Sequence, residues 1–424
     1  MKHIWAIAPL ILTACSAAAL QRPVPLGPLT EPAAPAAPAA PARVTVATTA
    51  VDSREVALAN RAFGLELYRN LAAKPGNVFV SPISLAGAFG PVAAGARAET
   101  RDAIGRVLRF PPSDAALHPQ LGGLLRALES DSEGARVSIA NGLWLMKGYR
   151  VNPDFVAVAS ESYAAEVESL DFNDGAASAA RINGWVERET NNRIRNLIAP
   201  DSLDEMTRVV VTNAVHFLGD WSQPFNSART RPEPFYLAGG GTRDVPMMSS
   251  NRHTGFTEVD SVQLLELPYK GRRLAMVVIL PKARGGLAAV ESNLTDDQLA
   301  RWLQQLDSDG ERGMLVQLPK VQIDSSYQLN GPLQAMGMGI AFDRTRANFR
   351  GIAENEQLFI SQVVHKTFLR IDEKGTEAGA ATAIEIQAES SAEPPTFRAD
   401  HPFLVLIRDK PTGAVLFLGR IAAP

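Results

Sequence analysis

The sequence predicts an α+β fold in which helices pack against long, mostly antiparallel strands. In several segments apolar residues recur every three or four positions, which is the period of an amphipathic helix. Other segments alternate apolar and polar residues, or are continuously apolar and rich in β-branched residues, as strands are. These segments follow one another irregularly and without a fixed repeat, which argues against a doubly wound parallel sheet. The 424 residues suffice for one large domain or two ordinary ones.

Residues 1–14 resemble the signal peptide of a bacterial lipoprotein. Lys2 and His3 precede an apolar run over residues 4–12 that is too short to span a membrane, and Leu-Thr-Ala-Cys at 12–15 matches a lipobox. Cleavage before Cys15 would leave a lipidated cysteine, whose acyl chains would give stable membrane anchoring. The alternative is an ordinary secretory signal with a chance cysteine. Ser16 is not the aspartate associated with inner-membrane retention, so we expect a cell-envelope protein of the outer membrane, facing the periplasm or the surface.

Residues 15–51 are predicted to form a semi-rigid spacer between this anchor and a folded domain over residues 52–424. The spacer is dominated by alanine and proline, which cannot bury a core and favour extended polyproline geometry. Cys15 is the one cysteine of the chain, so the domain contains no disulfide.

Helical periodicity begins at the start of the domain. Val56, Ala59, Phe63, Leu67 and Leu71 recur at three- and four-residue steps and predict a helix that ends before residue 74. Residues 77–85 predict a short buried strand that runs into a helix with a proline in its first turn. Helices are also predicted from about residues 98 and 115, where leucine and isoleucine repeat with the same period.

The middle of the chain predicts both element types. Strands are expected at 136–146 and 165–170, and helices at 153–160 and 177–192. Residues 208–217 form a continuous apolar, β-branched run, which predicts a strand buried on both faces.

The rest of the domain is predicted to be mostly strand. Apolar segments predict strands at 245–248, 254–258, 263–267, 274–280, 314–318 and 358–371, with one helix at 287–306. The chain closes with a strand pair at 403–408 and 415–420, joined by a turn that contains Pro411 and Gly413.

Composition excludes several function classes. The net charge of −3 and the absence of a basic stripe make nucleic acid an unexpected partner. The six histidines are scattered without metal-ligand spacing, and no H-E-x-x-H, cysteine pair or G-x-S-x-G motif occurs, so we expect no metal, no cofactor and no hydrolase activity.

Residues 372–386 have an unusual two-faced pattern. From Thr376 onward, one face of a strand would carry threonine, alanine and isoleucine, and the other would carry glutamate and small residues. Gly375 and Gly379 interrupt the segment, and serines and prolines follow it, so it also suits a mobile loop, and a surface helix or linker is a further alternative.

Several stretches resemble signatures of the serpin family, in order along about 370 residues. The segment from Glu373 to Ala378, followed by small residues to Thr382, resembles the serpin reactive-loop hinge. The other matching stretches begin at residues 77 (N-x-x-x-S-P-x-S), 182, 212, 267 (Leu-Pro-Tyr), 318 (Leu-Pro-Lys) and 401 (His-Pro-Phe).

This resemblance implies a fold of three β-sheets with eight to nine helices and an exposed reactive-centre loop at about 373–396. It also implies an inhibitor rather than an enzyme: a serine or cysteine protease cleaves the loop, and the loop then inserts into the main sheet before water releases the acyl-enzyme. The chain is expected to act as a monomer. In serpins that bind heparin the third helix is basic, and here it has only Arg126, so no polyanion activator is expected.

The resemblance also assigns roles to individual residues. The hinge would comprise Glu373, Gly375, Thr376, Glu377, Ala378, Gly379, Ala380, Ala381 and Thr382. The family's shutter, a hydrogen-bonded group under the middle of the sheet, would comprise Ser81, Ser84, Asn183 and His365. Its breach, at the top of the sheet, would comprise Trp221, Lys320 and Glu373.

The position of the scissile bond differs between two ways of counting. Counting forward from Gly375 places it between Glu389 and Ser390, which would suit glutamyl-specific proteases. Counting back from Pro394 and Pro395 places it between Ser391 and Ala392. Cleavage after Ala388 or Ile386 would instead suit proteases with apolar pockets. The competing function is a serpin without inhibitory activity, acting as a chaperone, carrier or scaffold, although the hinge lacks the bulky residues that usually mark such members.

Overall fold

The computed structural model describes residues 53–129, 134–376 and 394–424. One of its two sheets has six strands and is here called the central sheet, with strand order β10-β11-β12-β4-β2-β3. These strands are β10 (Val321–Gln328), β11 (Ile360–Ile371), β12 (Gly375–Thr376), β4 (Val209–Asp220), β2 (Ala135–Met146) and β3 (Glu166–Leu170). β4 and β11 are parallel and pair directly with each other over most of their length.

The remaining strands form a nine-stranded sheet that changes partners along β6 (Thr242–Val259). Residues 256–259 of β6 pair with β7, whereas residues 247–255 pair with β9. The sheet therefore has two parts and, with the central sheet, gives the three sheets that were expected. Its other strands are β1 (Val78–Val80), β5 (Arg231–Tyr236), β7 (Val262–Pro268), β8 (Leu274–Pro281), β9 (Glu311–Pro319), β13 (Thr396–Arg398), β14 (Phe403–Asp409) and β15 (Val415–Ile421).

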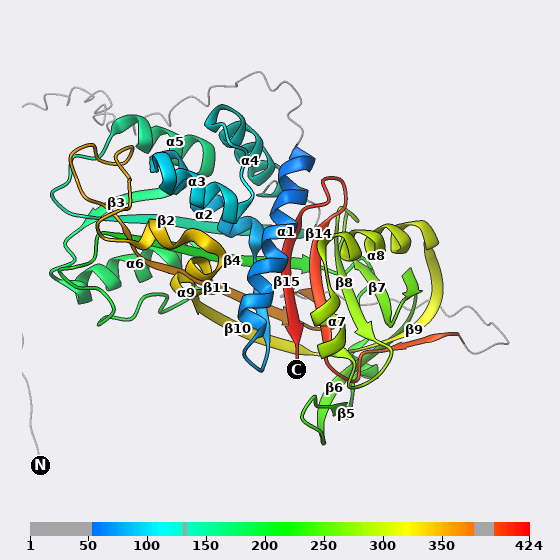
Figure 1. Ribbon diagram of the computed structural model, residues 1–424. Helices are drawn as coiled ribbons and strands as arrows, with labels where there is room; N and C mark the ends of the chain where they lie inside the picture. The colour runs from blue at the N-terminus through cyan, green and yellow to red at the C-terminus, as the bar shows by residue number, and fades with distance from the viewer. Residues whose placement is uncertain (1–52, 130–133, 377–393) are drawn as a thin grey trace, which may run out of the picture. The chain divides into compact units, whose positions relative to one another are not determined.

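Nine α-helices occur in the described residues, most of them on one side of the central sheet (Figure 1). They are α1 (Ser53–Ala72), α2 (Pro82–Gly95), α3 (Ala98–Leu108), α4 (Asp114–Glu129), α5 (Pro153–Tyr163), α6 (Gly175–Glu189), α7 (Leu287–Asn293), α8 (Asp296–Asp309) and α9 (Asn330–Leu333). The α+β prediction is therefore confirmed. None of these helices combines the length and apolar composition needed to cross a bilayer.

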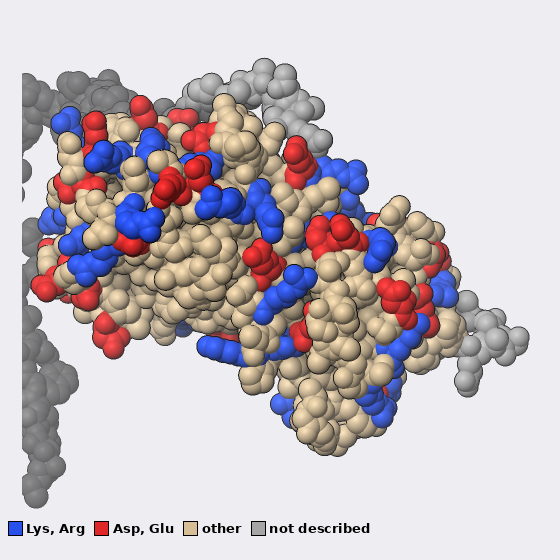
Figure 2. Space-filling view, in the orientation of Figure 1, with Lys and Arg blue, Asp and Glu red and all other residues tan. Residues whose placement is uncertain are grey.

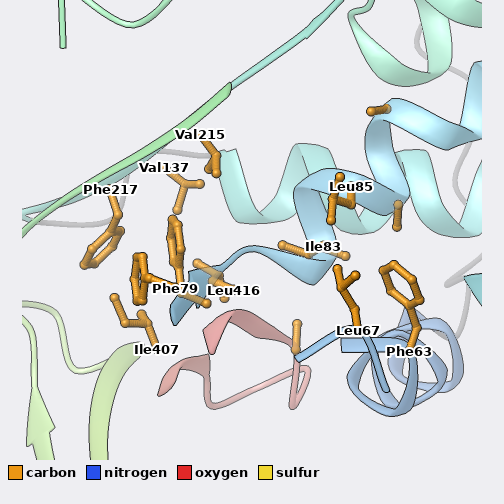
Figure 3. Close-up of a cluster of buried hydrophobic side chains, with 14 of the residues drawn as sticks. Phe63, Leu67, Phe79, Ile83, Leu85, Val137, Val215, Phe217, Ile407 and Leu416 are labelled. Carbon is orange, nitrogen blue, oxygen red and sulfur yellow. The ribbon is translucent and has the colours of Figure 1, made fainter. Parts of the chain in front are cut away.

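Helix α2 is buried almost completely because it lies between the central sheet and the other helices. Ser81 caps it by accepting a hydrogen bond from the backbone N–H of Ser84, and Pro82 fits the first turn because no donor is needed there. Figure 3 shows Val215 and Phe217 of β4 facing Phe79 and α2. Burying each such side chain contributes about 1.5–3 kcal/mol. This core fixes which face of β4 points inward.

Helix α6 covers the opposite face of the central sheet. Trp144 of β2 packs edge-on against Trp185 of α6, with ring centroids 5.3 Å apart. Val210 and Ala214 of β4 belong to this outer cluster. Alternate residues of β4 therefore face two separate apolar layers, which explains the continuous apolar sequence.

Several elements differ from the sequence prediction. The expected helix at 287–306 is two helices, because Thr295 caps a new helix by accepting from the backbone N–H of Gln298. The two strands expected between residues 245 and 258 are the single strand β6. Strand β5 was not predicted because it contains Pro232 and Pro234, which suit an edge strand that pairs with β6 alone.

Candidate functional site

The two residues of β12, Gly375 and Thr376, lie between β4 and β11 at one end of the central sheet. After Ile371 the chain turns, and Gly375 and Thr376 run back antiparallel to both neighbours. Gly375 is opposite Asp220, and Thr376 is opposite Gly219 on one side and Ile371 on the other. The start of the predicted hinge is therefore already a strand of this sheet.

The packing around β12 requires small residues. A Cβ atom on Gly375 would lie 1.9 Å from the carbonyl oxygen of Gly219, so only glycine fits at this approach. Thr376 is 1% exposed, and its hydroxyl is hydrogen-bonded to the hydroxyl of Tyr269 at 2.7 Å. Tyr269 is itself fully buried and stacks on Trp221 with centroids 4.7 Å apart.

An ion pair holds the turn that precedes β12. Nζ of Lys320 donates to Glu373 at 2.8 Å, and the hydroxyl of Thr230 donates to the other carboxylate oxygen at 2.8 Å. Burial alone would raise the pKa of Glu373, but these hydrogen bonds outweigh burial and hold the pKa below its ordinary value. Glu373 is therefore ionised at neutral pH.

The backbone of the same turn is hydrogen-bonded to the segment after β4. The indole N–H of Trp221 donates to the carbonyl of Asp372 at 3.0 Å, and its backbone N–H donates to Lys374 at 2.8 Å. The backbone N–H of Phe225 donates to the carbonyl of Glu373 at 2.7 Å. The structure thus brings together Trp221, Lys320 and Glu373.

A second polar group lies under the middle of the central sheet. His365 of β11 accepts a hydrogen bond at Nε2 from the backbone N–H of Ser81 at 3.1 Å. Because Nε2 accepts, Nδ1 carries the proton and donates to Oδ1 of Asn213 at 2.6 Å. Complete burial lowers the pKa of His365 to about 3, so the ring is neutral.

Asn213 of β4 is the centre of this group. Its Oδ1 also accepts from the hydroxyl of Ser84 at 2.8 Å. Its amide nitrogen donates to Oδ1 of Asn141 at 2.7 Å and to the carbonyl of Ser84 at 3.0 Å. The side chain therefore connects β2, β4, β11 and the start of α2, and every polar atom of its amide is paired.

Comparison with known proteins identifies the family. A family model described as serpin (serine protease inhibitor) matches residues 58–424. The chain belongs to the serpin family. The serpin fold is shared with uncleaved ovalbumin, whose structure has a TM-score of 0.79 and 30% identity and covers 87% of this chain and 100% of its own. Serpin48 of the insect Tenebrio molitor has a TM-score of 0.78 at 30% identity, covering 88% and 98%.

Two relatives show the range of this serpin family. A serpin-like protein of Thermococcus kodakarensis is 39% identical over 392 residues, which cover 90% of each chain. Leukocyte elastase inhibitor of Sus scrofa is 34% identical over 380 residues, which cover 87% of this chain and all of the relative. The chain therefore belongs to a family of protease inhibitors rather than to a class of enzymes.

One expected shutter residue of the serpin lies elsewhere. Asn183 of α6 donates to the carbonyl of Ile198 and accepts from its backbone N–H, both at 2.8 Å. It therefore fastens the segment that leaves α6, and the amide in the shutter is that of Asn213. The stretch 212–217 resembles a serpin signature, but the sequence assigns no role to Asn213. The one available signal is a polar residue within an apolar strand, and this signal does not identify the partners of that residue.

The rest of the predicted loop lies outside the described residues. This holds for the hinge residues from Glu377 to Thr382 and for both scissile bonds, Glu389–Ser390 and Ser391–Ala392. Cys15 and the spacer are also outside them. Within the described part of the chain, no group of three or more His, Cys, Asp or Glu is arranged to hold a metal ion.

Proposed function

We propose that this serpin inhibits serine-type endopeptidases, with cysteine endopeptidases as a second target class, by trapping them as covalent acyl complexes. The observation that carries the proposal is the position of β12. Gly375 and Thr376 occupy the entrance between two parallel strands, antiparallel to both, which is the arrangement that a longer inserted strand would continue.

The register of β12 supports this proposal. Thr376 pairs with Gly219, so each further residue of an inserted strand would move one position back along β4. Alternate residues of the inserted strand would then lie opposite alternate residues of β4: 378, 380, 382, 384 and 386 opposite Phe217, Val215, Asn213, Val211 and Val209. The four apolar residues of β4 belong to the inner core, and Asn213 faces Ser84 on the same side. The matching loop residues are alanine, alanine, threonine, isoleucine and isoleucine. Small residues would enter first and large apolar residues last.

The same register would bring Thr382 to the shutter. Position 382 would lie between Asn213 and His365, which are now joined by a hydrogen bond across β4 and β11. That bond must break when the strands part, and the threonine hydroxyl can replace it, because a hydroxyl both donates and accepts. Each new backbone hydrogen bond adds about 0.5–1.5 kcal/mol, so the inserted form is the more stable one.

The chemistry of trapping then follows from acyl transfer. The serine hydroxyl of the protease attacks the scissile carbonyl, the new amino terminus leaves with the proton, and an ester joins the loop to the protease. Insertion that is faster than hydrolysis of this ester would carry the protease away and distort its active site. Glu389–Ser390 is the proposed scissile bond, with Ser391–Ala392 as the alternative.

We further propose that the serpin domain is attached to the cell envelope by lipid on Cys15. The lipobox at residues 12–15 supports this, and the spacer at 15–51 would hold the domain away from the membrane. Mass spectrometry of the amino-terminal peptide tests the attachment. An unmodified cysteine, or cleavage at another residue, would contradict it.

Incubation of the protein with a panel of serine and cysteine proteases tests the inhibitory function. We expect a complex that survives boiling in detergent with at least one protease, and a rise in unfolding temperature after a single loop cut. Cleavage without a complex and without added stability would instead indicate a serpin that acts as a chaperone, carrier or scaffold.

A further inference from the structure

A buried guanidinium lies on the inner face of β6, close to the segment that follows β4. Arg252 pairs across the sheet with Met314 of β9 and is 7% exposed. Its guanidinium carbon lies 3.8 Å from the centre of the ring of Phe225, which is itself 2% exposed. The backbone N–H of Phe225 donates to the carbonyl of Glu373, so this guanidinium stacks on a residue that fastens the hinge turn.

One edge of this guanidinium is unpartnered in the part of the chain that the structure describes. Nε and Nη2 of Arg252 are both buried and form no hydrogen bond with the described residues. The same two nitrogens bind a carboxylate elsewhere in the protein: in Arg61 they donate to the two oxygens of Asp296 at 2.6 and 2.9 Å. In Arg408 they donate to Glu266. Arg252 thus presents the edge that binds anions in Arg61 and Arg408, but no described carboxylate reaches it.

The positive charge of Arg252 is also uncompensated among the described residues. Burial lowers the pKa of Arg252 to about 10, and no described carboxylate lies close enough to offset the effect of burial, yet the group stays charged at neutral pH. Ser250 and Thr254, its neighbours on the same face of β6, donate their hydroxyls to backbone carbonyls. Buried charges are normally paired, because an isolated charge is strongly unfavourable away from water. The site therefore requires a negatively charged acceptor.

We infer that Arg252 binds a small monovalent inorganic anion, such as chloride, through Nε–H and Nη2–H. The anion must be small, because the two nitrogens are inaccessible to solvent and Phe225 covers one face of the guanidinium. It accepts both hydrogen bonds at once, as the carboxylate of Asp296 does from Arg61. Neutralising the charge stabilises the uncut domain beside the hinge turn, and neither a protease nor insertion of the loop is needed.

Chloride titration of the uncut full chain tests the site. Chloride replaces gluconate, a larger organic anion, at constant ionic strength, so that screening stays the same. Raising chloride from about 1 to about 100 mM should raise the thermal unfolding midpoint by about 2 °C, for a dissociation constant of about 10 mM. R252M, which replaces the guanidinium by an apolar side chain, should show no chloride dependence. An equal rise in R252M would overturn the inference.

Two further variants show whether the paired N–H edge is responsible. R243Q is the matched control, since it removes an exposed guanidinium from the same strand, and it should keep the full response to chloride. R252K keeps the charge but lacks the paired edge, so it should need at least about tenfold more chloride for the same shift. An unchanged chloride requirement in R252K, or loss of the response in R243Q, would show that the anion binds elsewhere.

Crystals of the unsubstituted protein grown in bromide locate the anion directly, whatever the folding of the variants. We expect an anomalous peak within hydrogen-bond distance of both Nε and Nη2 of Arg252. Water at this edge, or a carboxylate from elsewhere in the chain, would overturn the inference. A bromide peak without a chloride effect on the unfolding midpoint would indicate an adventitious ion only and would overturn it equally.

Discussion

The hinge end of the contact between β4 and β11 differs from its middle. At the hinge end, β12 has already separated the strands, and Gly375 and Thr376 fill the space between them. In the middle, β4 and β11 pair directly, and Asn213 and His365 join them through side chains. Under the proposed function, the first two residues of the inserting strand are therefore already in place, and we expect the barrier to further insertion at the shutter.

Charged and polar groups also differ between the two regions. At the hinge end the ion pair of Lys320 and Glu373 is partly exposed, with 36% and 14% of the side chains accessible. In the middle, His365 and Asn213 are fully buried. Figure 2 shows basic and acidic side chains interspersed over the visible face, as is usual for exposed pairs that contribute little each. Strong constraints on the uncut form are therefore expected in the middle of the sheet.

Substitution of Thr376 by arginine is expected to have the largest effect. The side chain is 1% exposed beside Tyr269, so an arginine there cannot enter the sheet without burying an unpaired charge. Complex formation with a target protease should fall at least about 100-fold, with the loop still cleaved, because an insertion barrier higher by about 3 kcal/mol corresponds to that factor. Denaturing gels measure both products.

The control for this substitution is T376S, which keeps a small side chain and the hydroxyl that bonds to Tyr269. It should retain complex formation. If T376R formed the covalent protease complex as well as the unsubstituted protein, β12 would not be the leading part of the inserted strand. The proposed difference between the hinge end and the middle of the sheet would then be wrong.

Substitution of Asn213 by alanine tests the middle of the sheet. It leaves groups of Ser84, Asn141 and His365 without partners, so we expect the uncut protein to lose about 3 kcal/mol of unfolding free energy. Urea unfolding at neutral pH measures this. N183A is the matched control, since it removes the same side chain from two bonds to Ile198 and should cost about 1–2 kcal/mol. Equal losses of unfolding free energy in N213A and N183A would show that Asn213 stabilises the uncut protein no more than Asn183 does.

The two asparagines also show what the sequence did and did not predict. Apolar periodicity located most helices and strands, because a residue's burial depends on its position within its own element. Which polar residue enters the shutter depends instead on how α2, β2, β4 and β11 meet. Asn213 precedes Ala214 in a strand, and Asn183 follows Ile182 in a helix. Both are polar residues within regular elements, and only the tertiary arrangement distinguishes their roles.

The pH dependence of stability sharpens the comparison further. His365 has a pKa of about 3 in the folded protein, against an ordinary value of 6.5. The unfolded chain therefore binds a proton first as the pH falls, and stability is lost below pH 6.5 until the folded pKa is reached. We expect the uncut protein to lose about 2–3 kcal/mol between pH 7 and pH 4.5. In H365Q this loss should be largely absent, and parallel curves for the two proteins would show that other groups are responsible.

The smallest effect is expected from removing the charge of Lys320 at the hinge end. K320M should lower the unfolding free energy by about 0.5–1 kcal/mol at neutral pH, because the ion pair is partly solvated. Added salt should reduce the difference in stability between K320M and the unsubstituted protein. The pKa of Glu373 is lowered in the folded protein, so this contribution is present above its unfolded pKa and disappears as the pH falls through the folded value. K282M, which removes a more exposed pair with Glu258, is the control and should cost less. If urea unfolding shows that K320M loses more unfolding free energy than N213A, then the hinge end stabilises the uncut sheet more than the shutter does, which is the reverse of our expectation.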